Sequence, residues 1–204
     1  MNGNVAIIDY GLGNLKSVAA AFSYLGAVAA ISADVDQLRA ADRLVLPGVG
    51  AFGDGMNNLR QRNLIEPLNE LIRGGKPILG ICLGAQLLCK NSEEFGHHKG
   101  LGWIDGEVRR INGPESLRVP HVGWNEIEII ASSPLFNTVP DKALFYYCHS
   151  YAIHMKGAAD CIAICNYGRA FAAAFQRENV FGIQPHPEKS QRAGLSLLEG
   201  FLTA

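Results

Sequence analysis

Cys82 is the residue of this sequence whose surroundings best suit nucleophilic chemistry. It lies in Gly80–Gly84, a Gly-x-Cys-x-Gly segment with the spacing of a nucleophile elbow. The apolar run Pro77–Ile81 predicts a buried parallel strand leading into it, and the good helix formers of Ala85–Lys90 predict a helix after it. A helix N-terminus favours the thiolate form of a cysteine. The alternative is a buried structural cysteine at a strand end, since free cysteines are often buried.

His186 is the candidate general base. It follows the apolar run 180–184, so it falls at the end of a predicted strand as Cys82 does. Glu188 comes two residues later, and side chains two apart in an extended segment point to the same side. Glu188 can therefore hold one imidazole nitrogen and leave the other for the thiol, while the two neighbouring prolines stiffen the segment. Taken alone, the His-x-Glu pattern could also belong to a turn with no catalytic role, in which the two residues occur together by chance.

Strand and helix patterns alternate through the first half of the chain and must position these residues. In order they are Val5–Ile8, Leu15–Leu25, Val28–Ile31, Asp34–Ala40, Arg43–Leu46, Met56–Ile72 with a break near Pro67, and Pro77–Ile81. This alternation predicts a parallel sheet with helices on both faces, whose ligands bind at the carboxyl ends of the strands. The glycine-rich loop 47–50 falls at such an end, as Cys82 does. We interpret the loop as a candidate donor to an oxyanion, with a tight turn as the alternative.

The second half of the chain has short strand-like runs separated by turn signals. They cover residues 106–111, 124–130, 144–153, 161–166, 171–176 and 180–184, and a last helix is predicted over 191–201. We interpret these runs as an antiparallel extension of the sheet. The predicted fold class is therefore α/β, with an open, mostly parallel sheet flanked by helices, in a single domain over residues 1–204.

The composition excludes several classes of protein. Of the 204 residues, 48% are hydrophobic and 18% are charged, which provides for a sizeable core. A net charge of −1 gives no reason to expect a nucleic-acid or membrane partner. Five cysteines without a regular framework argue against a secreted disulfide scaffold, and no signal peptide is apparent. We expect a cytoplasmic protein. No histidine pair combines metal-ligand spacing with an acidic neighbour, so we expect no metal or other cofactor.

Two segments resemble the signatures of the class I, or triad, glutamine amidotransferases, whose fold is flavodoxin-like. They are GICLGAQ at Gly80–Gln86 and QPHPEKS at Gln184–Ser190. Four more segments, spread over nearly the whole chain, resemble the glutaminase subunits of imidazole glycerol phosphate synthases: IIDYGLGNLKSV at Ile7–Val18, LPGVGAFGDGM at Leu46–Met56, VPHVGWNEI at Val119–Ile127 and YYCHSY at Tyr146–Tyr151. Three positions depart from the usual pattern, namely Ala85, Cys148 and Pro185, and none of them is a member of the triad.

The resemblance implies hydrolysis of L-glutamine to glutamate and ammonia by Cys82, His186 and Glu188. It implies oxyanion donors at the amides of Leu83 and of the loop near Val49 and Gly50. The residues that it implies for the glutamine pocket are Gln86, Glu94, Ser150 and Tyr151. Without the resemblance, these four would be interpreted as polar residues of a helix surface and a strand turn.

The resemblance also implies a partner, a cyclase subunit with a (β/α)8 barrel that forms a heterodimer and receives the ammonia through a tunnel. Our candidates for the docking face are Asn14, His121, Trp124 and Lys189, although Trp124 alone would suit ordinary core packing equally well. The loop 47–50 is expected to become competent only when the partner binds its ligand. The alternatives are a glutaminase of another pathway, such as anthranilate synthesis, a thiol hydrolase of γ-glutamyl peptides, and a non-catalytic binding module of the same fold.

Overall fold

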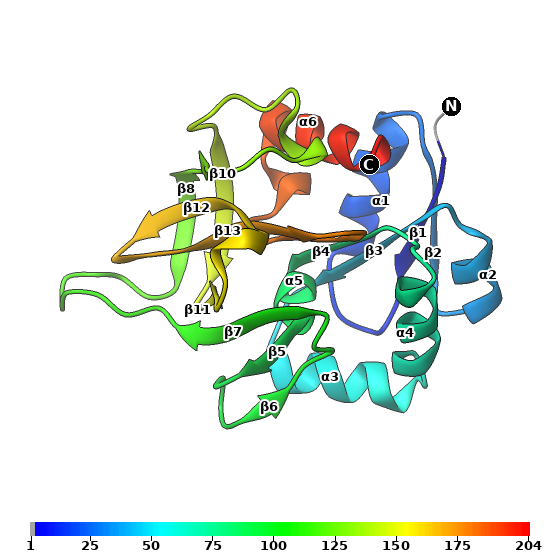
Figure 1. The fold of residues 1–204 in the computed structure, drawn as a ribbon, viewed down its shortest axis with the longest axis horizontal. Coiled ribbons are helices and arrows are strands. Elements are labelled where there is room, and N and C mark those ends of the chain that lie inside the picture. Colours follow the sequence, from blue (N-terminus) through cyan, green and yellow to red (C-terminus); the bar gives the residue numbers. More distant parts are fainter. Residues whose placement is uncertain (1–2) are drawn as a thin grey trace.

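The computed structural model describes residues 3–204 (Figure 1). Its strands are β1 (Asn4–Ile8), β2 (Val28–Ser32), β3 (Arg43–Gly48), β4 (Ile78–Cys82), β5 (Cys89–Ser92), β6 (His98–Lys99), β7 (Ile104–Arg110), β8 (His121–Glu126), β9 (Glu128–Ile129), β10 (Leu144–His149), β11 (Tyr151–Met155), β12 (Cys161–Tyr167), β13 (Arg169–Arg177) and β14 (Val180–Ile183). The α-helices are α1 (Leu15–Tyr24), α2 (Val35–Ala40), α3 (Phe52–Gln61), α4 (Ile65–Arg73), α5 (Leu83–Leu87) and α6 (Gln191–Leu202). Short 3-10 turns are η1 (Pro134–Phe136), η2 (Ala158–Asp160) and η3 (Pro187–Lys189).

The main sheet has eight strands in the order β2-β1-β3-β4-β14-β13-β12-β9. The pairs from β2 to β14 are parallel, and those from β14 to β9 are antiparallel. The predicted α/β class, with a mostly parallel sheet and an antiparallel extension, is confirmed. The extension is smaller than we predicted, because β8 and β10 form a separate two-stranded sheet and β11, β7, β5 and β6 form a separate four-stranded one.

Two predicted helix boundaries are wrong for identifiable reasons. The helix after Cys82 ends at Leu87, and the chain turns into β5, which pairs with β7; tertiary pairing overrides the helix propensity of this segment. The helical stretch after β3 breaks at Asn63, whose φ is 54°, rather than at Pro67. Pro67 lies in the first turn of α4, where a missing backbone N–H costs no helical hydrogen bond.

The alternation of β1 divides the core into two layers. Val5 and Ile7 pack with residues of α1 and α6 on one face, whereas Ala6 and Ile8 pack with residues of α2, α3 and α4 on the other. Figure 1 shows α1 and α6 above the sheet and α3 below it. This arrangement buries both faces of the parallel strands, as continuous apolar runs predict. No helix of residues 3–204 is long and apolar enough to cross a membrane.

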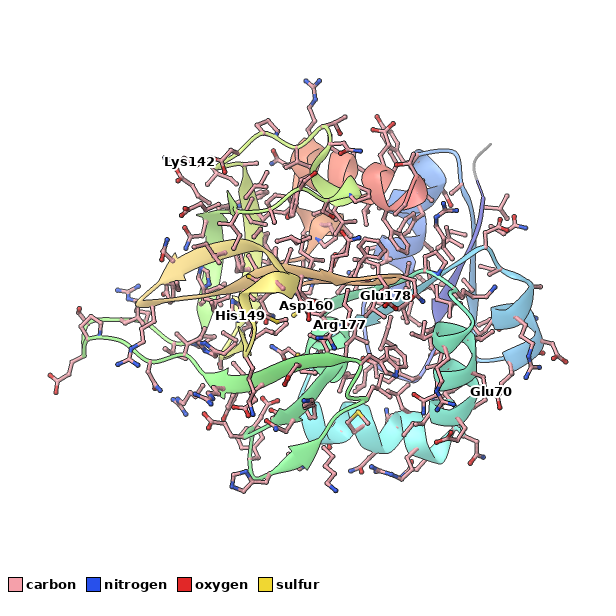
Figure 2. All side chains as sticks on the ribbon, in the orientation of Figure 1. Glu70, Lys142, His149, Asp160, Arg177 and Glu178 are labelled. Atoms are coloured by element: carbon pink, nitrogen blue, oxygen red, sulfur yellow. The ribbon has the colours of Figure 1, made fainter. Side chains whose placement is uncertain are left out.

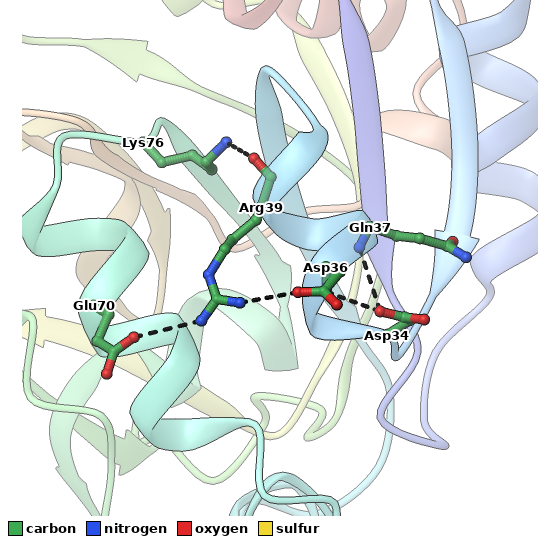
Figure 3. A network of polar contacts seen from close by, with 6 residues as sticks. All are labelled: Asp34, Asp36, Gln37, Arg39, Glu70 and Lys76. Atoms are coloured by element: carbon green, nitrogen blue, oxygen red, sulfur yellow. Dashed lines mark hydrogen bonds and ion pairs between the residues drawn. The ribbon is translucent and has the colours of Figure 1, made fainter.

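Polar contacts fix α2 against α4 at one end of the sheet (Figure 3). Asp34 caps α2 by accepting hydrogen bonds from the amides of Asp36, at 2.8 Å, and Gln37. The Arg39 guanidinium pairs with Asp36 at 3.0 Å and reaches Glu70 of α4 at 3.7 Å. These side chains are exposed, so they contribute orientation more than stability.

Candidate active site

Cys82 ends β4 in a strained elbow. Its φ of 52° and ψ of −112° lie outside the regions that residues with a Cβ usually adopt. A Cβ on Gly84 would lie 1.7 Å from the carbonyl oxygen of Leu46, so the turn needs glycine at this position. The thiol is consequently held at the carboxyl edge of the sheet, where α5 begins. The predicted strand, sharp turn and helix are confirmed.

The strand order brings two loops to the two sides of Cys82. On one side, Gly48 at the end of β3 is the direct register partner of Cys82. On the other side, β14 runs parallel to β4, with Ile183 opposite Ile81. The chain leaves β14 at the same edge and reaches His186 three residues later. Parallel pairing therefore assembles segments that are more than 100 residues apart in the sequence (82 to 186).

His186 and Glu188 form a buried ion pair next to the thiol. Nδ1 of His186 lies 2.9 Å from Oε1 of Glu188, and both side chains are almost fully buried. Burial alone would lower the pKa of His186, but hydrogen bonds and charge from Cys82 and Glu188 outweigh it and raise this pKa to about 10. The imidazolium is therefore the stable form at neutral pH, and its Nε2 is left for the thiol.

The turn that carries His186 is held by strand β10. The amide of His186 donates to the carbonyl oxygen of Tyr146 at 2.9 Å, and the amide of Tyr146 donates to Oγ of Ser190 at 3.0 Å. Pro185 falls between this bond and the last sheet bond, in which the amide of Gln184 donates to the carbonyl oxygen of Ala173 at 2.8 Å. Pro185 therefore lies between two residues whose backbone amides are both hydrogen-bonded. Its own missing N–H removes neither of these bonds.

A cavity of about 190 Å³ opens over Cys82 and gathers nearly all of the predicted site residues. It is lined by Val49, Gly50, Cys82, Leu83, Gln86, Glu94, Cys148, His149, Ser150, Tyr151, His186 and Lys189. Glu94 also accepts a hydrogen bond from the amide of Phe52 at 2.7 Å, and burial raises its pKa above the ordinary value. A small polar ligand in this cavity would meet the thiol, two segments of backbone amides and a carboxylate.

Three residues of this site were missed by sequence reasoning. Gln184 is fully buried, and its amide accepts from Nε2 of Gln86 at 3.1 Å and lies 3.9 Å from the Cys82 sulfur. His149 and Cys148 line the cavity from β10. Gln184 is polar at the end of an apolar strand, a signal that could have been used; the other two depend on how β10 pairs.

The predicted docking residues have different environments. Trp124 is 46% exposed on β8, Asn14 is exposed at the start of α1, and Lys189 lies at the cavity with Nζ 5.6 Å from the Tyr146 ring centroid. His121 is 3% exposed, so its side chain cannot meet a partner and we correct that prediction. His121 and Trp124 are three residues apart on one strand, so they point to opposite faces.

A family model for "Glutamine amidotransferase class-I" matches residues 6–204. The chain belongs to this family. Among curated relatives, the imidazole glycerol phosphate synthase subunit HisH of Sulfurimonas denitrificans is 46% identical over 97% of this chain and 96% of the relative. The protein of the same name from Geobacter sulfurreducens is also 46% identical, over 97% of both chains.

Solved structures show the same fold at low sequence identity. The structure of PurLQS from Thermotoga maritima superposes with a TM-score of 0.80 at 18% identity, over 100% of this chain and 99% of that chain. A putative GMP synthase subunit from Thermoplasma acidophilum superposes with a TM-score of 0.74 at 19% identity, over 98% of this chain and 92% of that chain. These likenesses support the fold.

Proposed function

We propose that this chain is the glutaminase subunit of an imidazole glycerol phosphate synthase, which hydrolyses L-glutamine and delivers the ammonia to a cyclase in histidine biosynthesis. The observation that carries this proposal is that Cys82 and His186 line one cavity, with Glu188 hydrogen-bonded to His186, in a chain with near full-length relatives of that name. The cavity suits an amino-acid ligand, and the elbow suits acyl transfer.

The first half-reaction uses the Cys82 thiolate and the His186 imidazolium. The sulfur attacks the side-chain amide carbon of glutamine, and a tetrahedral oxyanion forms. We assign the stabilisation of that charge to the amide of Leu83 and to an amide near Val49 and Gly50, residues that line the cavity. When the C–N bond breaks, His186 gives its proton to the leaving nitrogen, and ammonia departs from a glutamyl thioester.

The second half-reaction returns the enzyme to its starting state. The now neutral His186 removes a proton from water while the water oxygen attacks the thioester carbon. The C–S bond breaks, glutamate leaves, and the thiolate and imidazolium are restored. Glu188 favours the charged ring at both ends of the cycle, because its carboxylate lies 2.9 Å from Nδ1.

An exposed face beside the cavity supports docking of the cyclase. Cross-strand pairs of β8 and β10 place Val122 opposite Cys148 and Trp124 opposite Tyr146. Val122 and Trp124 are large apolar side chains that remain exposed, at 55% and 46%. We propose that this face, with Lys189 and Asn14, binds a (β/α)8-barrel cyclase in a heterodimer; the aromatic anchor and adjacent cation are typical of interface centres.

The decisive experiment is a glutaminase assay of the chain alone, with a cyclase subunit from the same pathway, and with that subunit plus its ribotide substrate. We expect weak hydrolysis alone and strong stimulation when partner and ribotide are present. Stimulation by an anthranilate synthase partner instead would assign the chain to anthranilate synthesis. Absence of hydrolysis in every mixture would favour a non-catalytic binding module of the same fold.

A further inference from the structure

His121 and His149 form a buried pair next to the glutamine cavity for which the proposed mechanism has no use. Nδ1 of His121 lies 3.1 Å from Nε2 of His149. The His121 ring is stacked between Tyr167, at a centroid distance of 3.8 Å, and Tyr147, at 4.6 Å. His149 is buried, and in the view of Figure 2 it lies farther from the outline of the molecule than Lys142 and Glu70 do. Buried polar side chains are normally hydrogen-bonded, so the partners of these two imidazoles indicate what the pair does.

The hydrogen bonds of the pair define one proton arrangement. Nδ1 of His149 lies 2.8 Å from the carbonyl oxygen of Tyr151, which can only accept, so this nitrogen carries a proton. In a neutral ring Nε2 of His149 is then an acceptor, and Nδ1 of His121 must donate to it. Burial lowers the pKa of both histidines to about 4, which is consistent with neutral rings at pH 7.

Asn125 fixes the outer end of the same chain of bonds. Its Oδ1 accepts from the amide of Glu126 at 2.8 Å, and its Nδ2 donates to the carbonyl oxygen of Asn166 at 3.2 Å, so the orientation of the amide is determined. Nδ2 also lies 3.4 Å from Nε2 of His121. A donor at this position requires the unprotonated Nε2, and a charged His121 would place two donors face to face.

The inner end of the chain reaches the glutamine cavity. The carbonyl oxygen of Tyr151, which accepts from His149, also accepts from Nε2 of Gln86 at 2.8 Å. The other hydrogen of this Gln86 nitrogen goes to Gln184, whose own amide nitrogen lies 3.9 Å from the Cys82 sulfur. Displacing the Tyr151 carbonyl would therefore release Gln86 and change the shape of the cavity.

We propose that His121 and His149 are positioning residues, two neutral imidazoles locked as Nδ1–H tautomers that hold the Tyr151 carbonyl and through it the glutamine pocket. In each hydrogen bond of this series, the donor is on the side of Asn125 and the acceptor is on the side of the cavity. Because Asn125 follows Trp124 on β8, the hydrogen bonds also connect the strand of this proposed docking residue to the pocket. The inference builds on the proposed function, whose substrate it uses, but the tautomers themselves can be observed independently of catalysis.

The first test is nitrogen-15 NMR of the imidazole rings of the parent chain at pH 7. The proposal requires both His121 and His149 to show a protonated Nδ1 and an unprotonated Nε2. A spectrum with either ring in the other tautomer, or doubly protonated, would overturn it. This measurement needs neither the cyclase nor turnover, so it stands even if the chain hydrolyses no glutamine.

The second test separates hydrogen bonding from packing. His121→Phe keeps a ring between the two tyrosines but removes both bonds, whereas His121→Asn keeps a donor where Nδ1 was. His154→Phe is the matched control, because His154 is a half-buried histidine of β11 outside this chain of bonds. Glutamine affinity is measured by calorimetry in a Cys82→Ala background, and KM and kcat are measured in the parent background with the cyclase present.

We expect His121→Phe to weaken glutamine binding and raise KM by about tenfold, with kcat within about threefold of the parent. His121→Asn and the His154 control should stay within about threefold on all three quantities. Unchanged affinity in a folded His121→Phe variant would overturn the positioning role, and so would equal losses in His121→Phe and His121→Asn. A parent chain that neither binds nor hydrolyses glutamine would instead refute the proposed function, leaving the NMR spectra to decide on the tautomers.

Discussion

Gly48 of β3 lies directly opposite Cys82 of β4, and a Cβ on Gly48 would come within 2.3 Å of the Tyr10 hydroxyl and 2.9 Å of the Gly84 amide nitrogen. The loop that we propose to supply one oxyanion donor therefore begins in contact with the elbow that we propose to supply the other. No side chain larger than hydrogen fits between them without moving one of the two.

Gly48→Ala should lower the glutaminase kcat by about 10²-fold, because the displaced loop or elbow would lose an oxyanion donor. The measurement is steady-state kinetics with the cyclase present. Gly157→Ala is the control, since a Cβ at that glycine meets nothing within 4 Å. The double variant with Tyr10→Phe should recover part of the rate, because it removes the nearest clashing atom. Full activity in Gly48→Ala would contradict the tight fit.

Cys82→Ala should reduce glutamine hydrolysis by at least about 10⁴-fold while the fold is retained, because it removes the attacking sulfur. Cys148→Ser should keep most of the activity, since Cys148 lines the same cavity from β10 and is not the residue at the elbow. Thermal melting and far-UV circular dichroism check the fold of both variants. Comparable activity of Cys82→Ala and the parent would refute the triad.

Glu188→Gln should lower the pKa of His186 from about 10 and reduce kcat by about 10²- to 10³-fold. A raised folded pKa stabilises the parent fully below the unfolded histidine value of about 6.5, and this stabilisation is lost as pH rises toward 10. Denaturant unfolding between pH 6 and pH 10 should therefore show a decline in the parent. The decline should be shallower in Glu188→Gln, and identical slopes would argue against the charged pair.

The buried histidine pair predicts the opposite behaviour in acid. The folded pKa values of His121 and His149 are lowered to about 4, so the unfolded chain binds more protons between pH 6.5 and pH 4. Stability should fall as pH falls through this range. His121→Phe removes one of these groups, and its unfolding free energy should depend less on pH in the same window. His154→Asn is a useful comparison, because burial also lowers the pKa of His154.

Trp124→Ala should weaken binding of the cyclase by about 10- to 100-fold without changing thermal stability, because its side chain is half-exposed on the docking face. Calorimetric titration with the cyclase measures the effect. Tyr24→Ala is the control, an exposed aromatic residue on α1 that belongs to no predicted contact. Equal affinities for the Trp124 variant and the parent would place the interface elsewhere.

Part of the site could be predicted because of one topological rule. Apolar runs mark β3 and β4, and parallel neighbours in a sheet end at the same edge, so Cys82 and the loop after β3 were expected to meet. The place of His186 at a strand end was also predicted. Its strand, however, was predicted within the antiparallel extension, and the parallel pairing of β14 with β4 joins segments far apart in the sequence, which no local signal specifies.

The environments of His121 and His149 could not be predicted in the same way. Their burial depends on the pairing of β8 with β10 and on the tip of the β12–β13 hairpin, from which Tyr167 covers the ring of His121. Strand alternation alone would have separated His121 from Trp124. Strand alternation could not have identified Tyr167 as the residue whose ring covers His121.

Cys148 has a practical consequence for anyone who wishes to count functional active sites. Cys148 is an exposed residue, whereas Cys82 is 6% exposed, and both line one cavity. An alkylating reagent can react with Cys148 as well as with Cys82, and a group added to Cys148 would narrow the cavity and mimic loss of the nucleophile. Inhibitor stoichiometry is interpretable only in a chain from which that second sulfur has been removed.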